Sequence, residues 1–316
     1  MILWSTDMKK KYHIIYIGII LVLCGALVIK SAENRTGVIP VDQDKSYPLL
    51  AKRLFVENPN DSRINFSGLR RQYLDYFDRE NIQGSLYFEY LPTGTSVRVN
   101  PDAKYRAASL IKLPVAMELY KAKGLGKVDL NQTIALKQEW LNDGYGELYK
   151  KGVGYELRLS DAVSIMLKDS DNTALRAVLD VTTPLLEDED RALGALDIEL
   201  KVADDGSIDI GTRSYSSFLK CLYFACYNTK EDSQAILETL TQSEFNNRIV
   251  AGIDDKNIPI AHKIGVFNTQ VQSDCGIVYL DNNNYVLCVM IEGDDTDEVN
   301  AHIAALSKIV YDFLSK

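Results

Sequence analysis

Two groups of short strand-like segments stand on either side of a long stretch with helical periodicity, and this order limits the chain to few folds. Alternating and apolar runs bounded by turn residues predict five strands. These strands lie at residues 84–90, 96–100, 260–267, 276–280 and 285–291. Turn signals at Pro92-Thr-Gly and at Asp281-Asn-Asn-Asn predict hairpins between the first two strands and between the last two.

A helix is predicted on each side of the strands, at residues 66–81 and 296–314, and helical patterns fill most of 105–255. The terminal helices can cover one antiparallel five-stranded sheet, while the helical insertion packs as a second, all-helical lobe. Apolar residues make up 46% of the chain and charged residues 25%, which is enough to bury such a core. The predicted fold class is therefore a two-lobed α/β (α+β) fold, with a ligand site in the cleft between the lobes.

The amino end has the features of a membrane anchor. Residues 13–29 form a segment of 17 residues without a formal charge if His13 is neutral. As a helix this segment is about 26 Å long, just enough to cross a bilayer core. Three lysines precede it, so the positive-inside rule places residues 1–12 in the cytoplasm. A cleaved signal peptide and a lipoprotein signal are the alternatives, but the sequence lacks an A-x-A-like site and a small residue before Cys24, which favours an uncleaved signal-anchor.

The rest of the chain is predicted to be exported. Residues 30–60 are polar and contain three prolines, which indicates a linker, and residues 61–316 form the predicted domain. We expect a single-pass protein of the cell membrane with this domain outside the cytoplasm; a secreted protein is the alternative. Residues 1–30 carry four lysines and one aspartate, so the formal charge changes from -9 for the whole chain to -12 without them. An acidic domain argues against a nucleic-acid partner.

Histidine and cysteine usage gives no sign of a metal site. The three histidines lie far apart and lack zinc-ligand spacing, so neither a metal nor another cofactor is expected. Four cysteines remain in the domain: Cys221, Cys226, Cys275 and Cys288. Cys275 and Cys288 can face each other across the last hairpin and form a disulfide. Buried free thiols that act as small apolar groups are the favoured interpretation.

Three short motifs carry candidate chemistry. They are Ser109-Leu-Ile-Lys112 at the start of a helical run, Ser170-Asp-Asn172 between two helical stretches, and His262-Lys263-Ile-Gly265 on the first of the late strands. Ser109 and Lys112 are three residues apart, so their side chains meet on one helical face. Burial among apolar neighbours lowers the pKa of an amine, and a neutral Lys112 can take the proton of Ser109. A second S-x-x-K tetrad, Ser217 to Lys220, is interpreted as coincidental.

In this order, the three motifs resemble those of the class A serine β-lactamases and the related penicillin-binding DD-peptidases. The resemblance covers residues 64–316. It implies that Ser109 becomes acylated by a β-lactam or by a D-Ala-type peptidoglycan amide, with Lys112 as the base. It also implies that Ser170 relays a proton to the leaving nitrogen and that Lys263 supplies positive potential.

The resemblance further assigns substrate binding to Asn172, Gly265, Val266 and Tyr105. Asn172 would bind a substrate amide and steady Lys112. The backbone N–H groups of Ser109 and Val266 would hold the oxyanion. Tyr105 stands four residues before the predicted nucleophile, where this family often has an aromatic side chain.

Two departures from the family pattern bear on the reaction. Ile264 stands where the family has a Ser or Thr that binds the substrate carboxylate, so this recognition is weakened or passes to a residue such as Asn268 or Thr269. In addition, no glutamate in an E-x-x-L-N setting follows the second motif, although class A enzymes use one for deacylation. Glu199 is the nearest substitute, but the favoured interpretation of this residue is a solvated surface carboxylate. The sequence therefore predicts acylation but identifies no deacylating base.

The expected function is that of a β-lactamase-like serine hydrolase that opens the β-lactam ring, as in β-lactam catabolism and the response to antibiotics. Two alternatives stay open. One is a DD-peptidase or amide hydrolase of the cell envelope that penicillin acylates but that releases the product slowly. The other is a non-catalytic module that binds peptidoglycan. Because all three motifs keep their reactive polar residues, a catalytic protein is favoured.

Overall fold

The computed structural model describes residues 65–198, 200–203, 207–267 and 270–315. The predicted anchor at 13–29 and linker at 30–60 lie outside the described residues, as do Glu199, Asn268 and Thr269. Within the described ranges, no helix has the length and apolar character that crossing a membrane requires. The predicted domain boundaries stay predictions.

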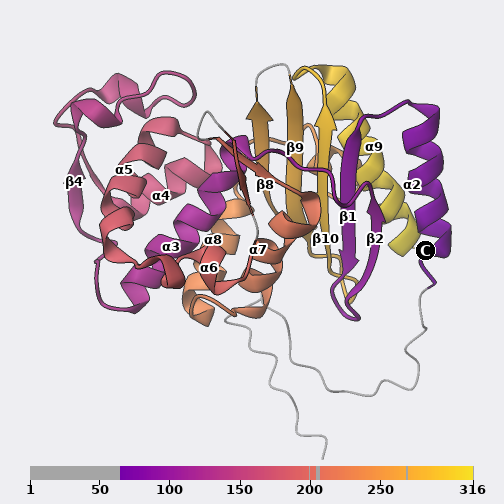
Figure 1. Ribbon diagram of the computed structural model, residues 1–316, viewed down its shortest axis with the longest axis horizontal. Helices are drawn as coiled ribbons and strands as arrows, with labels where there is room; N and C mark the ends of the chain where they lie inside the picture. Colours follow the sequence, from indigo (N-terminus) through magenta and orange to yellow (C-terminus); the bar gives the residue numbers. More distant parts are fainter. Residues whose placement is uncertain (1–64, 199, 204–206, 268–269, 316) are drawn as a thin grey trace, which may run out of the picture. The chain divides into compact units, whose positions relative to one another are not determined.

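A five-stranded antiparallel sheet forms the centre of the described domain (Figure 1). In the order of the sheet, its strands are β2 (Thr95–Val99), β1 (Gly84–Tyr90), β10 (Tyr285–Glu292), β9 (Val271–Val278) and β8 (Ile260–Phe267). All neighbouring strands pair antiparallel. Strands from both ends of the domain therefore meet in one sheet, which confirms the predicted fold class, and β8 lies at the edge of the sheet.

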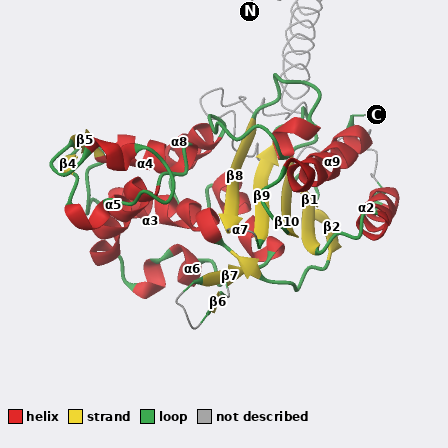
Figure 2. Cartoon of the chain, turned by 90° about the horizontal axis from the view of Figure 1, so that it is seen from above, coloured by secondary structure: helices red, strands yellow, loops and turns green. Residues whose placement is uncertain are grey.

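Helices cover both faces of this sheet (Figure 2). One face is covered by α2 (Ser67–Arg79) and α9 (Asp297–Leu314). The other face is covered by α7 (Thr212–Phe224). Leu69, Tyr73 and Phe77 of α2 are buried at a spacing of four residues, the spacing that predicts this helix from the sequence. Together with strand residues such as Leu86 and Leu287, they form the core on the α2 and α9 side.

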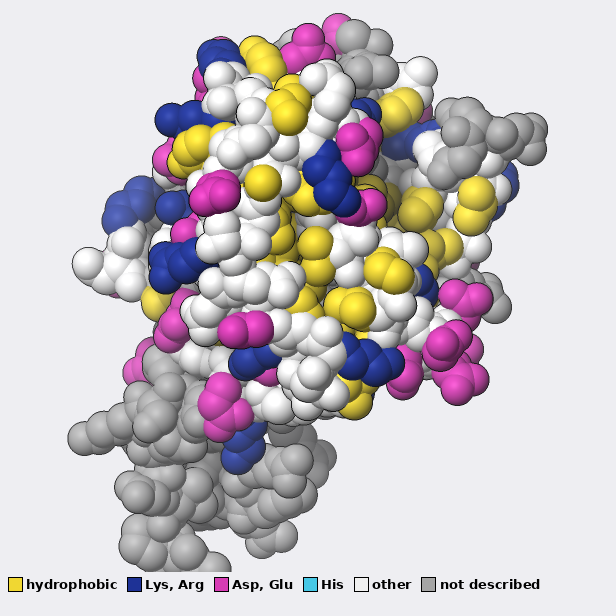
Figure 3. All heavy atoms as spheres, turned by 90° about the vertical axis from the view of Figure 1, so that its left-hand side faces the viewer, with side chains coloured by type: hydrophobic (Ala, Val, Ile, Leu, Met, Phe, Trp, Pro, Cys, Tyr) yellow, Lys and Arg dark blue, Asp and Glu magenta, His cyan; other side chains and the backbone are white. Residues whose placement is uncertain are grey.

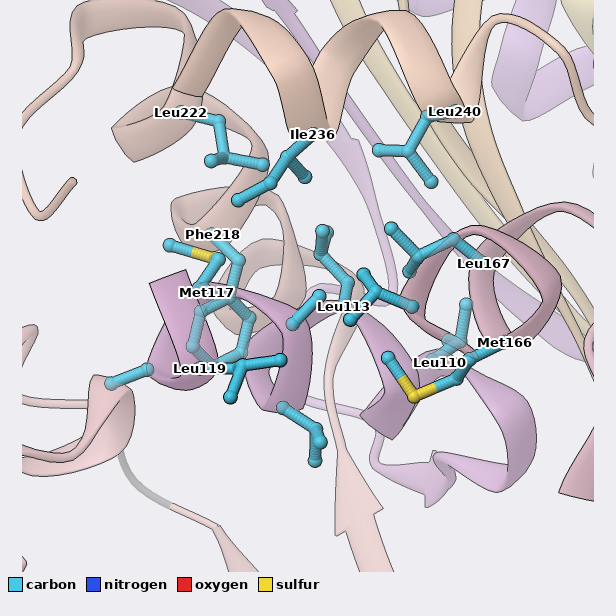
Figure 4. Packing of buried hydrophobic residues seen from close by; sticks show 14 of the residues in the cluster. Leu110, Leu113, Met117, Leu119, Met166, Leu167, Phe218, Leu222, Ile236 and Leu240 are labelled. Carbon is cyan, nitrogen blue, oxygen red and sulfur yellow. The ribbon is translucent and has the colours of Figure 1, made fainter. Parts of the chain in front are cut away.

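The second lobe is mainly helical, as predicted, and lies beside β8 (Figure 1). Its helices are α3 (Lys112–Gly124), α4 (Leu159–Lys168), α5 (Asn172–Thr182), α6 (Ala192–Ala195) and α8 (Lys230–Leu240). Figure 4 shows part of its core, where Leu113 and Met117 of α3 gather with Phe218 of α7 and Ile236 of α8. All four side chains are buried, so α3 is fixed from its first turn by apolar packing.

Short elements that the sequence pattern does not predict lie in both parts of the described domain. β3 (Tyr105–Arg106), β7 (Ile208–Ile210) and β6 (Lys201–Val202) form one small sheet, and β4 (Thr133–Ala135) and β5 (Glu156–Arg158) form another. Short 3₁₀-helices are η1 (Ala108–Ile111), η2 (Gln138–Trp140), η3 (Leu148–Lys151), η4 (Thr183–Leu185), η5 (Asp188–Asp190) and η6 (Ile249–Gly252). Elements of two to four residues are too short to show a periodicity.

Side-chain caps fix the start of two helices that matter for the site and the sheet. Asp171 accepts a hydrogen bond of 2.8 Å from the Ala174 N–H at the start of α5. Thr296 accepts one of 3.3 Å from the Val299 N–H at the start of α9, where two acidic residues in the first turn face the positive end of the helix dipole. The cap at Asp171 places Ser170 directly before a helix.

Strand β9 begins earlier than predicted, at residue 271 and not at 276. Its first half contains three buried polar residues, Gln272, Ser273 and Asp274. Asp274 pairs with His262 on β8, with 2.9 Å between Oδ1 and Nδ1, and the Ser273 carbonyl accepts a hydrogen bond from Arg248. In the sequence, a run of polar residues is typical of a loop. Here these residues can be buried in a strand because their hydrogen-bond partners come from other segments of the chain.

The domain contains two disulfides. Cys275 and Cys288 lie directly opposite each other on β9 and β10 and are bonded. Cys221 and Cys226 form the second disulfide, at the end of α7. The favoured interpretation of these residues as free thiols was wrong, whereas the alternative, a disulfide between Cys275 and Cys288 across the last hairpin, is confirmed by the register that aligns them.

The face at the end of the helical lobe carries charges of both signs (Figure 3). Lys and Arg side chains alternate there with Asp and Glu side chains around a central area where hydrophobic side chains are visible. The Lys and Arg side chains of this face are scattered and form no basic patch, as a surface that binds a polyanion would require.

Candidate active site

The first motif joins η1 to α3 and brings its two polar side chains together. Lys112 Nζ donates a hydrogen bond of 2.8 Å to Ser109 Oγ. Ala108, directly before Ser109, has a φ of 45°, a left-handed conformation that is unfavourable for an alanine. Such strain is typical of positions where the surrounding structure holds a functional residue in place.

Lys112 is completely buried, at 0% exposure, and the protein supplies its hydrogen-bond partners. Besides Ser109, its amine donates to the Ser170 carbonyl at 2.6 Å and to Asn172 Oδ1 at 2.8 Å. Burial lowers the pKa of Lys112 to about 8, and the nearby negative charge of Asp171 opposes this shift only in part. A lysine with this pKa is partly neutral near physiological pH and can then accept a proton.

The hydroxyl of Ser170 lies between two lysines. Its Oγ is 3.2 Å from Lys112 Nζ and 2.9 Å from Lys263 Nζ. Ser170 has a φ of 57°, again a left-handed conformation for a residue other than glycine. Lys263 is buried on β8, and its pKa lies well below the ordinary value, mainly because of burial and next because of the charge of Lys112. One hydroxyl therefore connects the two amines and the two lobes.

The second motif is anchored by the loop that precedes η3. Asp171 Oδ2 accepts a hydrogen bond of 2.9 Å from the Leu148 N–H, and the Asn172 N–H donates one of 3.0 Å to the Tyr145 carbonyl. Gly146, with a φ of 92°, allows this contact, because a Cβ there would overlap the Asp171 side chain. These contacts hold Ser170 and Asn172 at fixed positions beside Lys112.

Gly265 lets the nucleophile segment approach the sheet. A Cβ at this position would lie 3.0 Å from Leu110 Cγ and 3.1 Å from the Ala107 carbonyl oxygen. The residues on either side of Ser109 therefore pack closely against β8 because residue 265 has no side chain. Val266 follows on the same edge strand.

The structure thus brings together the predicted residues Ser109, Lys112, Ser170, Asn172 and Lys263, with Gly265 packed against the same segment. Tyr105, another predicted site residue, lies apart from this cluster. Within the described part of the chain it makes no hydrogen bond or ring contact with this cluster, and it lines a groove with Glu292 and His302. Its predicted role in substrate binding stays a prediction.

The second S-x-x-K tetrad has no such cluster around it, as expected. Lys220 Nζ donates a hydrogen bond of 2.9 Å to Glu89, and Ser217 Oγ is 3.5 Å from the Arg213 carbonyl of its own helix. Among the described residues, no group of three or more His, Cys, Asp or Glu is placed to hold a metal ion.

Three residues near the cluster were not predicted. Arg248 is buried at 1% exposure beside β8 and β9. Tyr145, before η3, and Phe245, between α8 and η6, come from two loops far apart in sequence, and their ring centroids lie 6.1 Å apart. The Lys263 ammonium lies 5.8 Å from the centre of the Phe245 ring. No motif marks these positions, although an arginine directly before an apolar run and a tyrosine between two glycines were visible in the sequence.

Comparison with known proteins agrees with this geometry. A sequence profile of the beta-lactamase enzyme family matches residues 68–314. The chain belongs to the beta-lactamase enzyme family, within the superfamily of serine β-lactamases and penicillin-binding DD-peptidases. The beta-lactamase regulatory protein BlaB of Streptomyces cacaoi is 28% identical over 122 residues, which are 38% of this chain and 39% of that protein. The match thus spans well under half of that relative.

Solved structures share the fold. PBP-A superposes with a TM-score of 0.71 at 22% identity, covering 79% of this chain and 96% of that one. A β-lactamase from Sphaerobacter thermophilus DSM 20745 has a TM-score of 0.70 at 23% identity, over 80% of this chain and 98% of that one. A mutant of PBP-A in an acyl-enzyme complex with penicillin G has a TM-score of 0.71 at 23% identity, over 79% and 97%.

Proposed function

We propose that this protein is a serine hydrolase that forms an acyl-enzyme on Ser109 by opening a β-lactam ring or a related cell-envelope amide. The observation that carries the proposal is the buried Lys112 amine, 2.8 Å from the Ser109 hydroxyl and with its pKa lowered to about 8. A serine hydroxyl is a weak nucleophile until a base takes its proton, and a neutral amine at hydrogen-bond distance is such a base.

In the proposed acylation, Ser109 Oγ attacks the carbonyl carbon and its proton moves to the neutral Lys112 amine. The carbonyl π bond opens to an oxyanion, which the backbone N–H groups of Ser109 and Val266 would hold. When the C–N bond then breaks, the leaving nitrogen needs a proton. Ser170 Oγ can give its own proton and recover one from Lys112, to which it is hydrogen-bonded.

Lys263 would keep the Ser170 hydroxyl oriented for this transfer. Its amine donates to Ser170 Oγ at 2.9 Å and to the Ile264 carbonyl at 3.2 Å, which fixes the position of the amine. Asn172 would orient Lys112 in the same way, through the bond to its Oδ1. These roles are the ones that the family resemblance implies.

Deacylation is the weaker half of the proposed cycle. Among the described residues, no Asp or Glu is hydrogen-bonded to Ser109 or Lys112, although a carboxylate that activates water would be expected there. We propose a long-lived acyl-enzyme on this basis, and this favours a second candidate, a DD-peptidase-like penicillin-binding protein. The penicillin G acyl-enzyme of the PBP-A mutant, a protein of the same fold, is consistent with such a species.

We place the proposed activity outside the cytoplasm, at the cell membrane. The two disulfides support this location, because disulfides persist in oxidising compartments. The anchor at residues 13–29 remains a proposal from the sequence. Peptidoglycan amides and β-lactams both occur on that side of the membrane.

The intact mass of the full-length protein, followed over time with benzylpenicillin, tests the proposal. A transient increase by the mass of the drug, followed by its loss, indicates β-lactamase turnover. An increase that persists indicates the penicillin-binding alternative. The Ser109→Ala variant must show neither, and an unmodified wild-type protein would leave only a non-catalytic module and contradict the proposal.

A further inference from the structure

A cavity of about 240 Å³ lies in the helical lobe and is bordered by η1, the segment that carries Ser109. Leu110 of η1, Val115 of α3 and Phe218 of α7 form its inner wall, and all three side chains are buried. Figure 4 shows Leu110 and Phe218 within the surrounding core. Side chains from α5, α6 and β7 close the remaining sides. Segments from several parts of the chain therefore enclose one space beside the nucleophile segment.

The surface of this cavity is apolar throughout. Of the described residues that line it, only Glu118 and Tyr215 have polar side-chain atoms. The Glu118 carboxylate accepts hydrogen bonds from the Ala192 N–H at 3.1 Å and from Arg191 at 3.4 Å, so the start of α6 engages it. Burial raises the pKa of Tyr215, and the charge of Asp274 on β9 raises it further, so this hydroxyl lies within electrostatic reach of the sheet. A polar ligand would lose its hydration in the cavity without gaining a partner.

The size of the cavity fits one compact hydrocarbon. A cavity of about 150 Å³ lined by aliphatic and aromatic side chains stays dry and holds a benzene ring, so this larger one can take a substituted ring. Ile111, Leu179 and Leu193 border the space and are half-buried, so a ligand can enter past apolar side chains. The groove beside Tyr105 differs from this cavity, because Glu292 and other charged side chains line it.

The segment η1 borders both this cavity and the edge strand β8. Its packing against the strand is tight, since a Cβ at Gly265 would lie 3.0 Å from Leu110 and 3.1 Å from the Ala107 carbonyl. Ala107 and Leu110 also line the cavity, where they face empty space. The left-handed backbone of Ala108, with a φ of 45°, persists only if the surrounding structure holds it. A ligand in the cavity would add van der Waals contacts to this same segment.

We propose that the cavity is a binding site for a free, small, neutral hydrocarbon, a substituted benzene ring or a compact branched chain, and that its occupant steadies η1. The site is distinct from the catalytic cluster, because Ser109, Lys112, Ser170 and Lys263 do not line the cavity. The occupant supplies the contacts that η1 lacks on the side of the cavity. This inference does not depend on the proposed acylation.

Toluene and phenol are a matched pair of probes, because they differ only by a methyl group in place of a hydroxyl. Urea unfolding of the full-length protein in lipid nanodiscs is measured over a range of concentrations of each probe. A ligand that binds only the folded state lowers the equilibrium constant of unfolding about 10-fold at ten times its Kd. We expect toluene to stabilise the domain in a saturable way. Phenol should bind at least about 10-fold more weakly, because its hydroxyl finds no partner in the wall.

Variants of one residue of the wall localise the binding. Leu179→Trp fills the cavity from α5 and should abolish the effect of toluene. Leu125→Trp adds the same side chain at an exposed position directly after α3 and should keep the effect. All proteins are measured in the same nanodiscs, so lipid takes up the same amount of toluene in each case. Should Leu179→Trp fail to fold, Leu179→Asn places an amide of similar volume in the wall and should weaken toluene binding about 10-fold.

Hydrogen exchange tests whether the occupant steadies η1. Saturating toluene should slow the exchange of the backbone N–H groups of residues 107–113 in the wild-type protein and leave it unchanged in Leu179→Trp. N–H groups of α2 that exchange equally fast are the controls, because their local opening does not release the ligand.

If toluene stabilises neither protein, or stabilises the wild type and Leu179→Trp equally, the proposed site does not exist. Phenol that binds as tightly as toluene would contradict a purely apolar site. Stabilisation without slower exchange at residues 107–113 would refute the effect on η1. None of these measurements involves acylation of Ser109, so a negative result here leaves the proposed function in place.

Discussion

The protonation state of Lys112 sets the pH range in which Ser109 can react. The ammonium form has no lone pair for the Ser109 proton, and with a pKa of about 8 the neutral fraction falls as the pH drops below that value. We expect the second-order rate of acylation to rise about tenfold per pH unit below the pKa and to level off above it. Quenched intact mass with a β-lactam over a range of pH measures this profile.

The chain offers a matched control for this residue. Lys112→Arg keeps a cation that holds its proton, and Lys112→Ala removes the base, so both should slow acylation by about 10²–10⁴-fold. Lys220→Ala alters the second S-x-x-K tetrad, whose lysine pairs with Glu89, and should leave the rate unchanged. An arginine variant that reacts at the wild-type rate would show that another group takes the proton.

The contact between η1 and the edge strand β8 can be tested by a substitution at Gly265. In Gly265→Ala the new Cβ would meet Leu110 and the Ala107 carbonyl at 3.0 and 3.1 Å, so η1 must move away from the sheet. We expect a loss of about 1–3 kcal/mol in the free energy of unfolding, as for an overpacked core. Acylation should slow as well, because Ser109 lies between the two residues that are displaced. Denaturant unfolding and the acylation rate measure the two effects.

Gly124→Ala is the control for this substitution. Gly124 ends α3, and a Cβ there would have nothing within 4 Å, so alanine should leave stability unchanged or raise it slightly. If both variants behave alike, the close approach at Gly265 does not position the nucleophile.

The sequence predicts elements well where one face of a segment is apolar, and poorly where polar residues are buried. The spacing of Leu69, Tyr73 and Phe77 predicts α2, and the alternation in residues 84–90 predicts β1. The start of β9 was missed because Asp274 needs His262 as its partner, and that partner lies on another strand. A buried polar residue cannot be told from a loop residue until its partner is known.

Across the whole domain, the order of the three motifs predicts which of their side chains come together at the site. It does not predict which other residues surround these side chains. Ser109, Ser170 and Lys263 lie far apart in sequence and converge because the helical lobe stands beside β8. Arg248 and the ring pair of Tyr145 and Phe245 belong to no motif. Their proximity depends on how two loops that lie far apart in sequence pack, which local sequence patterns do not encode.

The disulfides connect the fold to the compartment in which the chain folds. The Cys275–Cys288 bond links residues 13 apart in sequence and should stabilise the domain by about 3 kcal/mol through the loop that it closes. The double variant Cys275→Ser with Cys288→Ser should lose that amount in denaturant unfolding. The pair Cys221 and Cys226, only 5 residues apart, closes a shorter loop, and its double serine variant should lose less, about 2 kcal/mol.

Export provides the independent check on these bonds. If residues 1–30 carry the domain out of the cytoplasm, the full-length protein isolated without reductant should resist thiol alkylation at all four domain cysteines. A chain that begins at residue 31 and stays in a reducing cytoplasm should be alkylated at the same positions, because thiols are kept reduced there. If the cysteines of both chains are alkylated equally, disulfide formation does not depend on export. The proposed location of the active site would then lose its structural support.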